Sequence, residues 1–103
     1  MRVIKKEPNR PYRVVNMDGA AIAKEFGKHN IKEKVITPDC AILYIRKTPD
    51  ARENVRMWGK TYWGTIFVVG IKDEVYSDIP QTLQQLIRKI RRRKERMNNT
   101  ETY

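Results

Sequence analysis

The densest group of chemically active side chains lies near the C-terminus. Seven cations stand within nine positions, with Glu95 as the only acid among them: Arg88, Lys89, Arg91, Arg92, Arg93, Lys94 and Arg96. Cations late in a helix also complement its dipole, but at about 0.3 to 1 kcal/mol each this explains one or two of them, not seven. We expect the run to neutralise phosphates of a nucleic acid or nucleoprotein. A solvated tail, an acidic protein face and a lipid surface are the alternatives.

A second group mixes aromatic and basic side chains within residues 56–63, RMWGKTYW. Its candidate binding residues are Arg56, Trp58, Lys60 and Tyr62. Proteins that bind single strands combine flat rings for base stacking with cations for the backbone. Aromatic residues beside a glycine are also common in cores. We therefore expect Tyr62 or Trp63 in the core and Trp58 exposed, where a ring could equally serve a protein interface.

Residues suited to catalysis or metal binding are few. His29 is the only histidine and Cys40 the only cysteine, so neither a histidine-based dyad nor a cysteine zinc site has enough members. The glycines match no phosphate-binding loop. We expect no catalytic residue, no metal and no cofactor. An enzyme remains possible only if acids distant in the sequence converge on a pocket.

Composition and charge fit one small domain. The chain has 103 residues, of which 40% are hydrophobic, enough for a single core. The net charge is +10, and half of it falls within residues 88–103, which hold seven basic residues against two acids. A positive balance favours polyanionic partners. No apolar N-terminal stretch or long apolar run indicates secretion or a membrane span, so we expect a cytoplasmic protein with no membrane partner.

The elements that must position these side chains are mostly strands. The pattern predicts strands over residues 2–6, 12–16, 32–37, 40–47 and 65–71. The last two are the most apolar, and we expect them to lie side by side in the core. Asp18 can cap a helix over residues 19–28, with Ile22 and Phe26 one turn apart. Residues 48–63 show no sustained period and are predicted to form a long loop.

The C-terminal segment has a helical pattern. Ser77 or Asp78 can cap a helix with Pro80 in its first turn. Its apolar stripe consists of Leu83, Leu86, Ile87, Ile90 and Met97. The predicted fold is therefore α+β: a small, mostly antiparallel sheet of four to five strands with one short helix and a long basic C-terminal helix. We expect helices against one face of the sheet, with residues 1–79 as the core and 80–103 as the basic helix and tail of the same domain. The stripe leaves a homodimer open.

Three stretches resemble a family of short uncharacterised proteins from phages and bacterial mobile elements, classed as a domain of unknown function. They are MRVIKKEPNRPYRVVNMDG, TPDCAILYIRK and NVRMWGKTYWGTIFVVG, spread over residues 1–70. The resemblance implies a viral accessory protein encoded near antirestriction and other counter-defence genes. This chain departs from the family at its C-terminus, which is usually shorter and more acidic.

Two functional hypotheses follow. In the first, a non-enzymatic phage or mobile-element protein acts on host defence inside the host cell, as an anti-CRISPR or antirestriction inhibitor. It would occupy the nucleic-acid-binding surface or guide RNA of a nuclease. In the second, it is a free DNA- or RNA-binding accessory or regulatory protein that uses the basic C-terminal segment. The expected partner is nucleic acid in both cases, either naked or within a nuclease complex.

Overall fold

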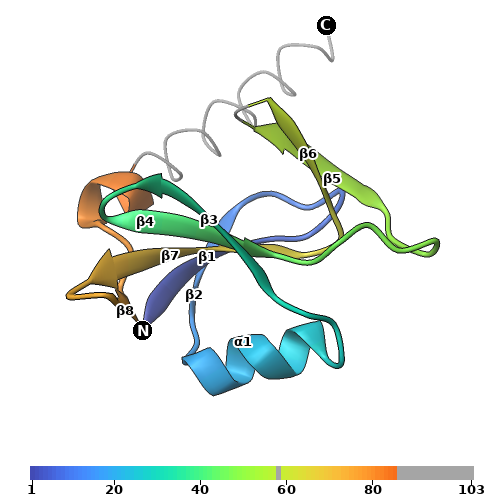
Figure 1. The fold of residues 1–103 in the computed structure, drawn as a ribbon. Helices are drawn as coiled ribbons and strands as arrows, with labels where there is room; N and C mark the ends of the chain where they lie inside the picture. The colour runs from blue at the N-terminus through green and yellow to red at the C-terminus, as the bar shows by residue number, and fades with distance from the viewer. Residues whose placement is uncertain (58, 86–103) are drawn as a thin grey trace, which may run out of the picture.

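The computed structural model describes residues 1–57 and 59–85 and consists mainly of antiparallel sheet (Figure 1). The regular elements are β1 (Arg2–Lys6), β2 (Arg13–Asn16), α1 (Gly19–Phe26), β3 (Lys32–Thr37), β4 (Cys40–Tyr44), β5 (Glu53–Met57), β6 (Lys60–Trp63), β7 (Ile66–Lys72) and β8 (Val75–Ser77). Residues 81–85 are helical. One sheet has the order β2-β1-β7-β4-β3 with β8 beside β7, and β5 and β6 form a separate hairpin.

The strand register sorts the apolar side chains onto two faces. Val68 of β7 lies opposite Ile4 of β1 on one side and Ile42 of β4 on the other. Because successive residues of a strand point to opposite faces, the neighbours Val3, Ala41 and Phe67 belong to the other face. Each face must then be covered by a separate element to bury its apolar side chains.

The first face is covered by the β5–β6 hairpin and the start of the C-terminal segment. Its buried cluster consists of Ile4, Cys40, Ile42, Tyr62, Ile66, Val68 and Ile79. Val55 and Met57 of the hairpin and Leu83 of the helical residues 81–85 pack against it. Cys40 is a small residue of this core.

The second face is covered by α1. Its side-chain cap is Asp18, which accepts a hydrogen bond from the Ala21 amide at 2.7 Å. Ile22 and Phe26 are buried against the sheet, and the Phe26 ring meets Phe67 edge-on with centroids 5.4 Å apart. Gly27, at φ 65°, ends the helix and turns the chain toward β3.

The backbone after β8 crosses close to β7 and is hydrogen-bonded to β1. After β8 the chain passes over Gly70, where a Cβ would lie 2.0 Å from the Asp78 carbonyl oxygen. The Arg2 amide donates to the Asp78 side chain at 2.6 Å, and the Ile79 amide donates to the Arg2 carbonyl at 2.9 Å. These contacts lead the chain from β8 to the face that the hairpin covers.

The predicted fold class is wrong in three respects. The described part of the chain has eight strands in two sheets, not four to five in one. Its helices are two short segments, α1 and residues 81–85, and no long C-terminal helix belongs to it. These two segments lie on opposite faces of the sheet, because Leu83 packs in one cluster and Ile22 and Phe26 in the other.

The predicted loop over residues 48–63 is largely the β5–β6 hairpin. The apolar contacts of this hairpin with the sheet are made by Val55, Met57 and Tyr62. Apart from Trp63, the other described positions of the two strands are polar, and a register shift between Glu53 and Arg56 interrupts the alternation. The two-residue periodicity that identifies a strand is therefore weak in this segment.

Candidate nucleic-acid interface

The residues that the sequence singled out lie in two parts of the chain. Trp58 and the seven cations Arg88, Lys89, Arg91, Arg92, Arg93, Lys94 and Arg96 fall outside the described residues. The other three lie in the hairpin. Arg56 is an exposed residue of β5, and Lys60 and Tyr62 lie in β6.

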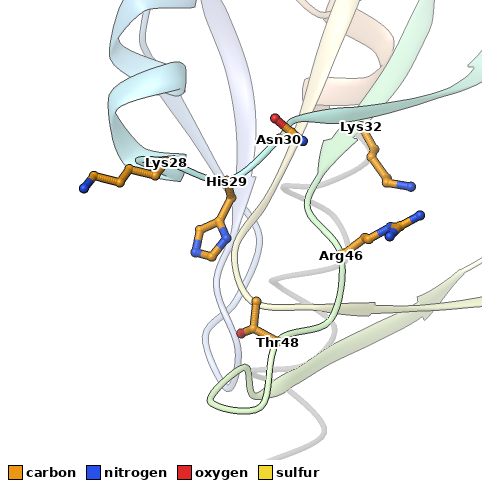
Figure 2. Close-up of a pocket in the computed structure, with 6 residues that line it drawn as sticks. All are labelled: Lys28, His29, Asn30, Lys32, Arg46 and Thr48. Carbon is orange, nitrogen blue, oxygen red and sulfur yellow. The ribbon is translucent and has the colours of Figure 1, made fainter.

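A basic hollow of about 560 Å³ lies between the α1–β3 connection and the segment after β4 (Figure 2). Its lining residues are Lys28, His29, Asn30, Lys32, Arg46 and Thr48. All six side chains can donate hydrogen bonds, and none is an acid. Figure 2 shows Lys32 and Arg46 extending to the same side, whereas Lys28 points away from them. The composition fits an oxyanion such as a phosphate.

A second hollow, of about 250 Å³, continues the first toward the hairpin. It is lined by Lys32, Tyr44, Ile45, Arg46, Lys47, Lys60, Thr61, Tyr62 and Trp63. Lys32 and Arg46 line both hollows, so the two adjoin. We call their union the basic–aromatic cleft. Lys32 comes from β3, Arg46 follows β4, and the aromatic wall comes from β4 and β6.

Two lysines of the cleft lie against aromatic rings. The Lys47 ammonium is 4.1 Å from the Trp63 ring centroid. The Lys60 ammonium is 4.0 Å from the Tyr44 centroid and donates a hydrogen bond to the Tyr44 hydroxyl at 2.6 Å. A cation over a ring at an exposed site gains about 0.5 to 1 kcal/mol. The rings therefore hold these two charges at defined places in the wall.

Tyr62 is a core residue rather than a contact residue. It is 1% exposed, and its ring meets Tyr44 edge-on with centroids 5.1 Å apart. Burial raises the pKa of Tyr62, and the neighbouring Tyr44 raises it further. Within the part of the chain that the structure describes, its hydroxyl has no hydrogen-bond partner. Tyr62 therefore supports Tyr44 from beneath and offers no free ring face to a base.

Five cations of the cleft have no carboxylate partner among residues 1–57 and 59–85: Lys28, Lys32, Arg46, Lys47 and Lys60. Glu33 is next to Lys32 in sequence, but strand alternation points it to the other face. There it accepts a hydrogen bond from the Tyr76 hydroxyl. Burial, the Glu33 hydrogen bond and the Glu33 charge together raise the pKa of Tyr76 to about 12. The nearest acid in the sequence is thus directed away from the cleft.

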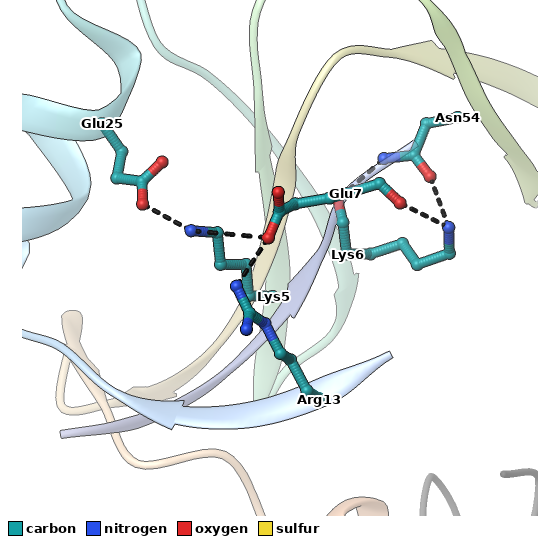
Figure 3. Close-up of polar contacts among 6 residues, drawn as sticks. All are labelled: Lys5, Lys6, Glu7, Arg13, Glu25 and Asn54. Carbon is teal, nitrogen blue, oxygen red and sulfur yellow. Dashed lines mark hydrogen bonds and ion pairs between the residues drawn. The ribbon is translucent and has the colours of Figure 1, made fainter. Parts of the chain in front are cut away.

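Cations near β1 and β2 are paired instead (Figure 3). The Lys5 ammonium contacts Glu25 of α1 and lies 3.8 Å from Glu7, which also pairs with Arg13 at 2.5 Å. The buried Lys6 ammonium donates to the Glu7 carbonyl at 2.7 Å and to the Asn54 side chain at 3.0 Å. These cations hold β1, β2, α1 and the hairpin together.

Most of the cleft is not predicted from the sequence. Lys60 and Tyr62 are predicted binding residues and Trp63 is predicted only as an alternative core residue, whereas Lys28, Lys32, Arg46, Lys47 and Tyr44 are not predicted at all. One feature of the sequence indicates part of this group. The pair Arg46–Lys47 stands just after the apolar central strand, and charged residues at the end of a buried strand often face solvent. The rest of the group forms only when β3, β4 and β6 are brought together.

No family model, curated protein or solved structure matches the chain. Residues 1–57 and 59–85 contain no cluster of three side chains able to hold a metal ion. No helix in this described part is long and apolar enough to cross a membrane. Function is therefore inferred from the charge and geometry of the cleft.

Proposed function

We propose that this chain is a non-enzymatic nucleic-acid-binding protein whose basic–aromatic cleft receives the phosphate backbone. The observation that carries the proposal is the gathering of five cations without a carboxylate partner in the described residues, beside Tyr44 and Trp63. Cations without a carboxylate partner repel one another, and the ring contacts of Lys47 and Lys60 account for only two of the five. A polyanion with flat bases satisfies both the charges and the rings.

The alternatives account for fewer of the residues. Lys28 follows the C-terminus of α1, where a cation complements the helix dipole. That reason does not extend to Lys32, Arg46 or Lys47, which follow or belong to strands. An acidic protein face would pair with the cations, but it would not need a flat ring face such as a base stacks on at Trp63. A lipid surface favours a helix with a broad apolar face beside its cations, which the cleft lacks.

The C-terminal run from Arg88 to Arg96 supports the same partner through its charge alone. Seven more cations would extend the contact beyond the cleft. In single strands each phosphate contact contributes about 0.7 to the slope of log K against log salt. Binding that uses the cleft and this run together should therefore be strongly salt-dependent.

The sequence resemblance to proteins of phages and mobile elements supports a role for this protein in counter-defence. In that setting the nucleic acid is the guide or target strand held by a host defence nuclease, and this protein inhibits by occupying it. The second candidate, a free DNA- or RNA-binding accessory protein, requires the same cleft. The two differ in whether naked nucleic acid is bound tightly.

Fluorescence anisotropy with labelled single-stranded DNA, single-stranded RNA and duplex DNA, at about 50 and about 200 mM salt, tests the proposal. The cleft variant Lys32→Ala/Arg46→Ala should lose about tenfold or more in affinity at low salt, and its salt slope should fall by about 1.4. The matched control is Lys24→Ala/Lys72→Ala, which removes the same charge from exposed positions outside the cleft. Its affinity should change by no more than about twofold.

The C-terminal run is tested separately in the full chain by Arg91→Ala/Arg92→Ala/Arg93→Ala. Unchanged affinity in this triple variant would remove the run from the interface. Equal losses in the cleft variant and its control would show a diffuse charge effect and overturn the cleft.

The inhibitor and the free binder are separated by a second measurement. The inhibitor form predicts feeble binding to naked strands, retention of a guide-loaded nuclease on the immobilised protein, and slower cleavage by that nuclease. The free-binder form predicts tight binding to naked strands and no effect on cleavage. If neither naked strands nor a loaded nuclease is bound, the proposed function fails.

A further inference from the structure

Trp63 differs from the other rings of the cleft in what covers it. Its backbone is fixed at the base of the hairpin, where Trp63 pairs with Glu53 and the next amide, of Gly64, donates to the Arg52 carbonyl at 2.8 Å. The side chain over its ring is Lys47, an exposed residue of the segment after β4. Within the described part of the chain, the Lys47 side chain makes no hydrogen bond or ion pair beside this ring contact. The Trp63 ring is thus held in place by its backbone, whereas the Lys47 side chain can move off the ring.

The other two rings are not available in this way. Lys60 is half-buried and contacts Tyr44 twice, through the ring face and through the hydroxyl. The Tyr44 ring also packs edge-on against Tyr62, which lies in the core. Displacing Lys60 from Tyr44 would therefore break a hydrogen bond as well as a cation–π contact. Trp63 is the ring of the cleft whose face is most easily uncovered.

Relative magnitudes favour a base over Lys47 on this face. A cation–π contact at an exposed site corresponds to about a two- to fivefold effect on an equilibrium constant. Stacking of a base on an aromatic side chain corresponds to about five- to 150-fold. A displaced Lys47 is not lost, because its ammonium can pair with a phosphate. Exchange of Lys47 for a base therefore gains stacking at the Trp63 ring and an ion pair between the Lys47 ammonium and a phosphate.

We propose that Trp63 is a base-stacking position, uncovered when Lys47 moves to a phosphate, and that the cleft therefore takes single-stranded nucleic acid in preference to duplex. This inference rests on the proposed function and names its substrate class. Bases in a duplex are already stacked on each other and do not present a face to Trp63. Lys32 and Arg46, which line both hollows, then lie beside the phosphate next to the stacked base.

Tryptophan fluorescence with matched oligonucleotides tests the inference. The probes are a short single-stranded DNA, an abasic strand of the same length and backbone charge, and the corresponding duplex. The chain has two tryptophans, so the titration is done on the intact protein and on Trp58→Phe, in which Trp63 is the only one. The single strand should quench Trp63 emission, and the abasic strand should bind at least fivefold more weakly without quenching it.

Substitutions at Trp63 and Lys47 complete the test. Trp63→Leu should remove the difference in affinity between normal and abasic strands, and Trp63→Phe should restore part of it. The Phe variant also guards against misfolding, because it keeps an aromatic ring at the hairpin base. Lys47→Ala should leave the quenching by single strands in place and lower the salt slope by about 0.7, the value of one lost phosphate contact.

The outcomes separate this inference from the proposed function. Equal affinity for normal and abasic strands without quenching would overturn stacking, while the backbone binding itself would uphold the proposed function. Tighter binding of duplex than of single strand would also overturn it. Failure to bind any of the three probes would overturn the stacking role, and failure of the guide-loaded nuclease to bind as well would overturn the proposed function.

Discussion

The two edges of the sheet use the same kinds of cation in opposite ways. At the β2 edge, Lys5 and Arg13 pair with carboxylates and Lys6 with an amide and a carbonyl, within the same chain (Figure 3). At the β3 edge, Lys32 and Arg46 have no carboxylate partner in residues 1–57 and 59–85 (Figure 2). The local sequences do not reveal the difference, since both edges mix lysine, arginine and glutamate.

The cations of the β2 edge serve the stability of the fold, whereas those of the β3 edge serve binding. Cations at the β2 edge join four elements, so their removal should lower stability and leave binding unchanged. Lys32 and Arg46 at the β3 edge make no ion pair with another described element, so their removal should lower binding and leave stability unchanged.

Asn54→Ala should cause the largest change. The Asn54 amide donates to the carbonyls of Lys6 and Gly64, both at 2.7 Å, and its oxygen accepts from the buried Lys6 ammonium. Removing it takes the side-chain donor away from both carbonyls and removes one of the partners of the Lys6 ammonium, so the free energy of unfolding should fall by about 2 to 4 kcal/mol. Urea denaturation measures it. The matched control, Asn30→Ala at an exposed amide of the cleft, should change stability by less than about 0.5 kcal/mol. Similar small changes in both would contradict the structural role of the β2 edge.

Glu7→Gln should free Arg13 and leave Lys5 paired with Glu25 alone. Glu7 contacts both Lys5 and Arg13, and ion pairs at partly exposed positions contribute up to about 1 kcal/mol. Unfolding free energy should fall by that amount, and affinity for a single-stranded oligonucleotide should rise by up to about twofold at low salt, because Arg13 is released while Lys5 keeps its pair with Glu25. Asp50→Asn changes the net charge equally at an exposed acid with no ion pair among the described residues, and it should raise affinity less. An equal rise in both would mean that net charge alone governs binding.

Alkaline pH should reveal the contact that directs Glu33 away from the cleft. The pKa of Tyr76 is raised from 10.0 to about 12, so the folded state keeps its proton after the unfolded state has lost it. This contribution to stability is complete below pH 10 and disappears as the pH rises toward about 12. Burial also raises the pKa of Tyr12 and Tyr62, which adds slope of the same sign. Tyr76→Phe should flatten the curve of unfolding free energy between these pH values. An unchanged slope would show that Tyr76 does not hold Glu33.

Lys32→Ala/Arg46→Ala should have the smallest effect on stability. No carboxylate partner in the described chain is lost, so unfolding free energy should stay within about 0.5 kcal/mol of the parent value or rise slightly as repulsion is relieved. The same urea titration measures it. A loss well above about 1 kcal/mol would place these two cations with the structural ones.

The sequence predicts elements that are apolar on a regular period. Asp18, Ile22 and Phe26 identify α1 because a cap and two residues one turn apart are local features. The apolar runs of β4 and β7 identify the two central strands, because a strand covered on both faces has no polar alternation. The hairpin was missed because only one of its sides is buried, and its polar side follows no simple period.

The candidate site could be predicted only in part, for a different reason. Lys60 and Tyr62 were found from the composition of residues 56–63, although Tyr62 serves in the core. Lys32 and Arg46 are unremarkable in their own segments, and Trp63 is expected only as an alternative core residue. The three meet only through the β3–β4 register and the packing of the hairpin on the sheet. Nor does sequence tell that Glu33 faces away while Glu7 and Glu25 pair with lysine and arginine. Those facts depend on strand alternation and tertiary contact.

Chemical-shift mapping by NMR on the intact, isotope-labelled protein tests the contrast between the two edges most directly. Titration with a short single-stranded oligonucleotide should shift the backbone amides of residues 28–32, 44–48 and 60–63. The amides of Lys5, Lys6 and Arg13, whose side chains are already paired, should not move. Shifts concentrated at the β2 edge with the cleft unchanged would contradict the division of the cations into structural and binding groups.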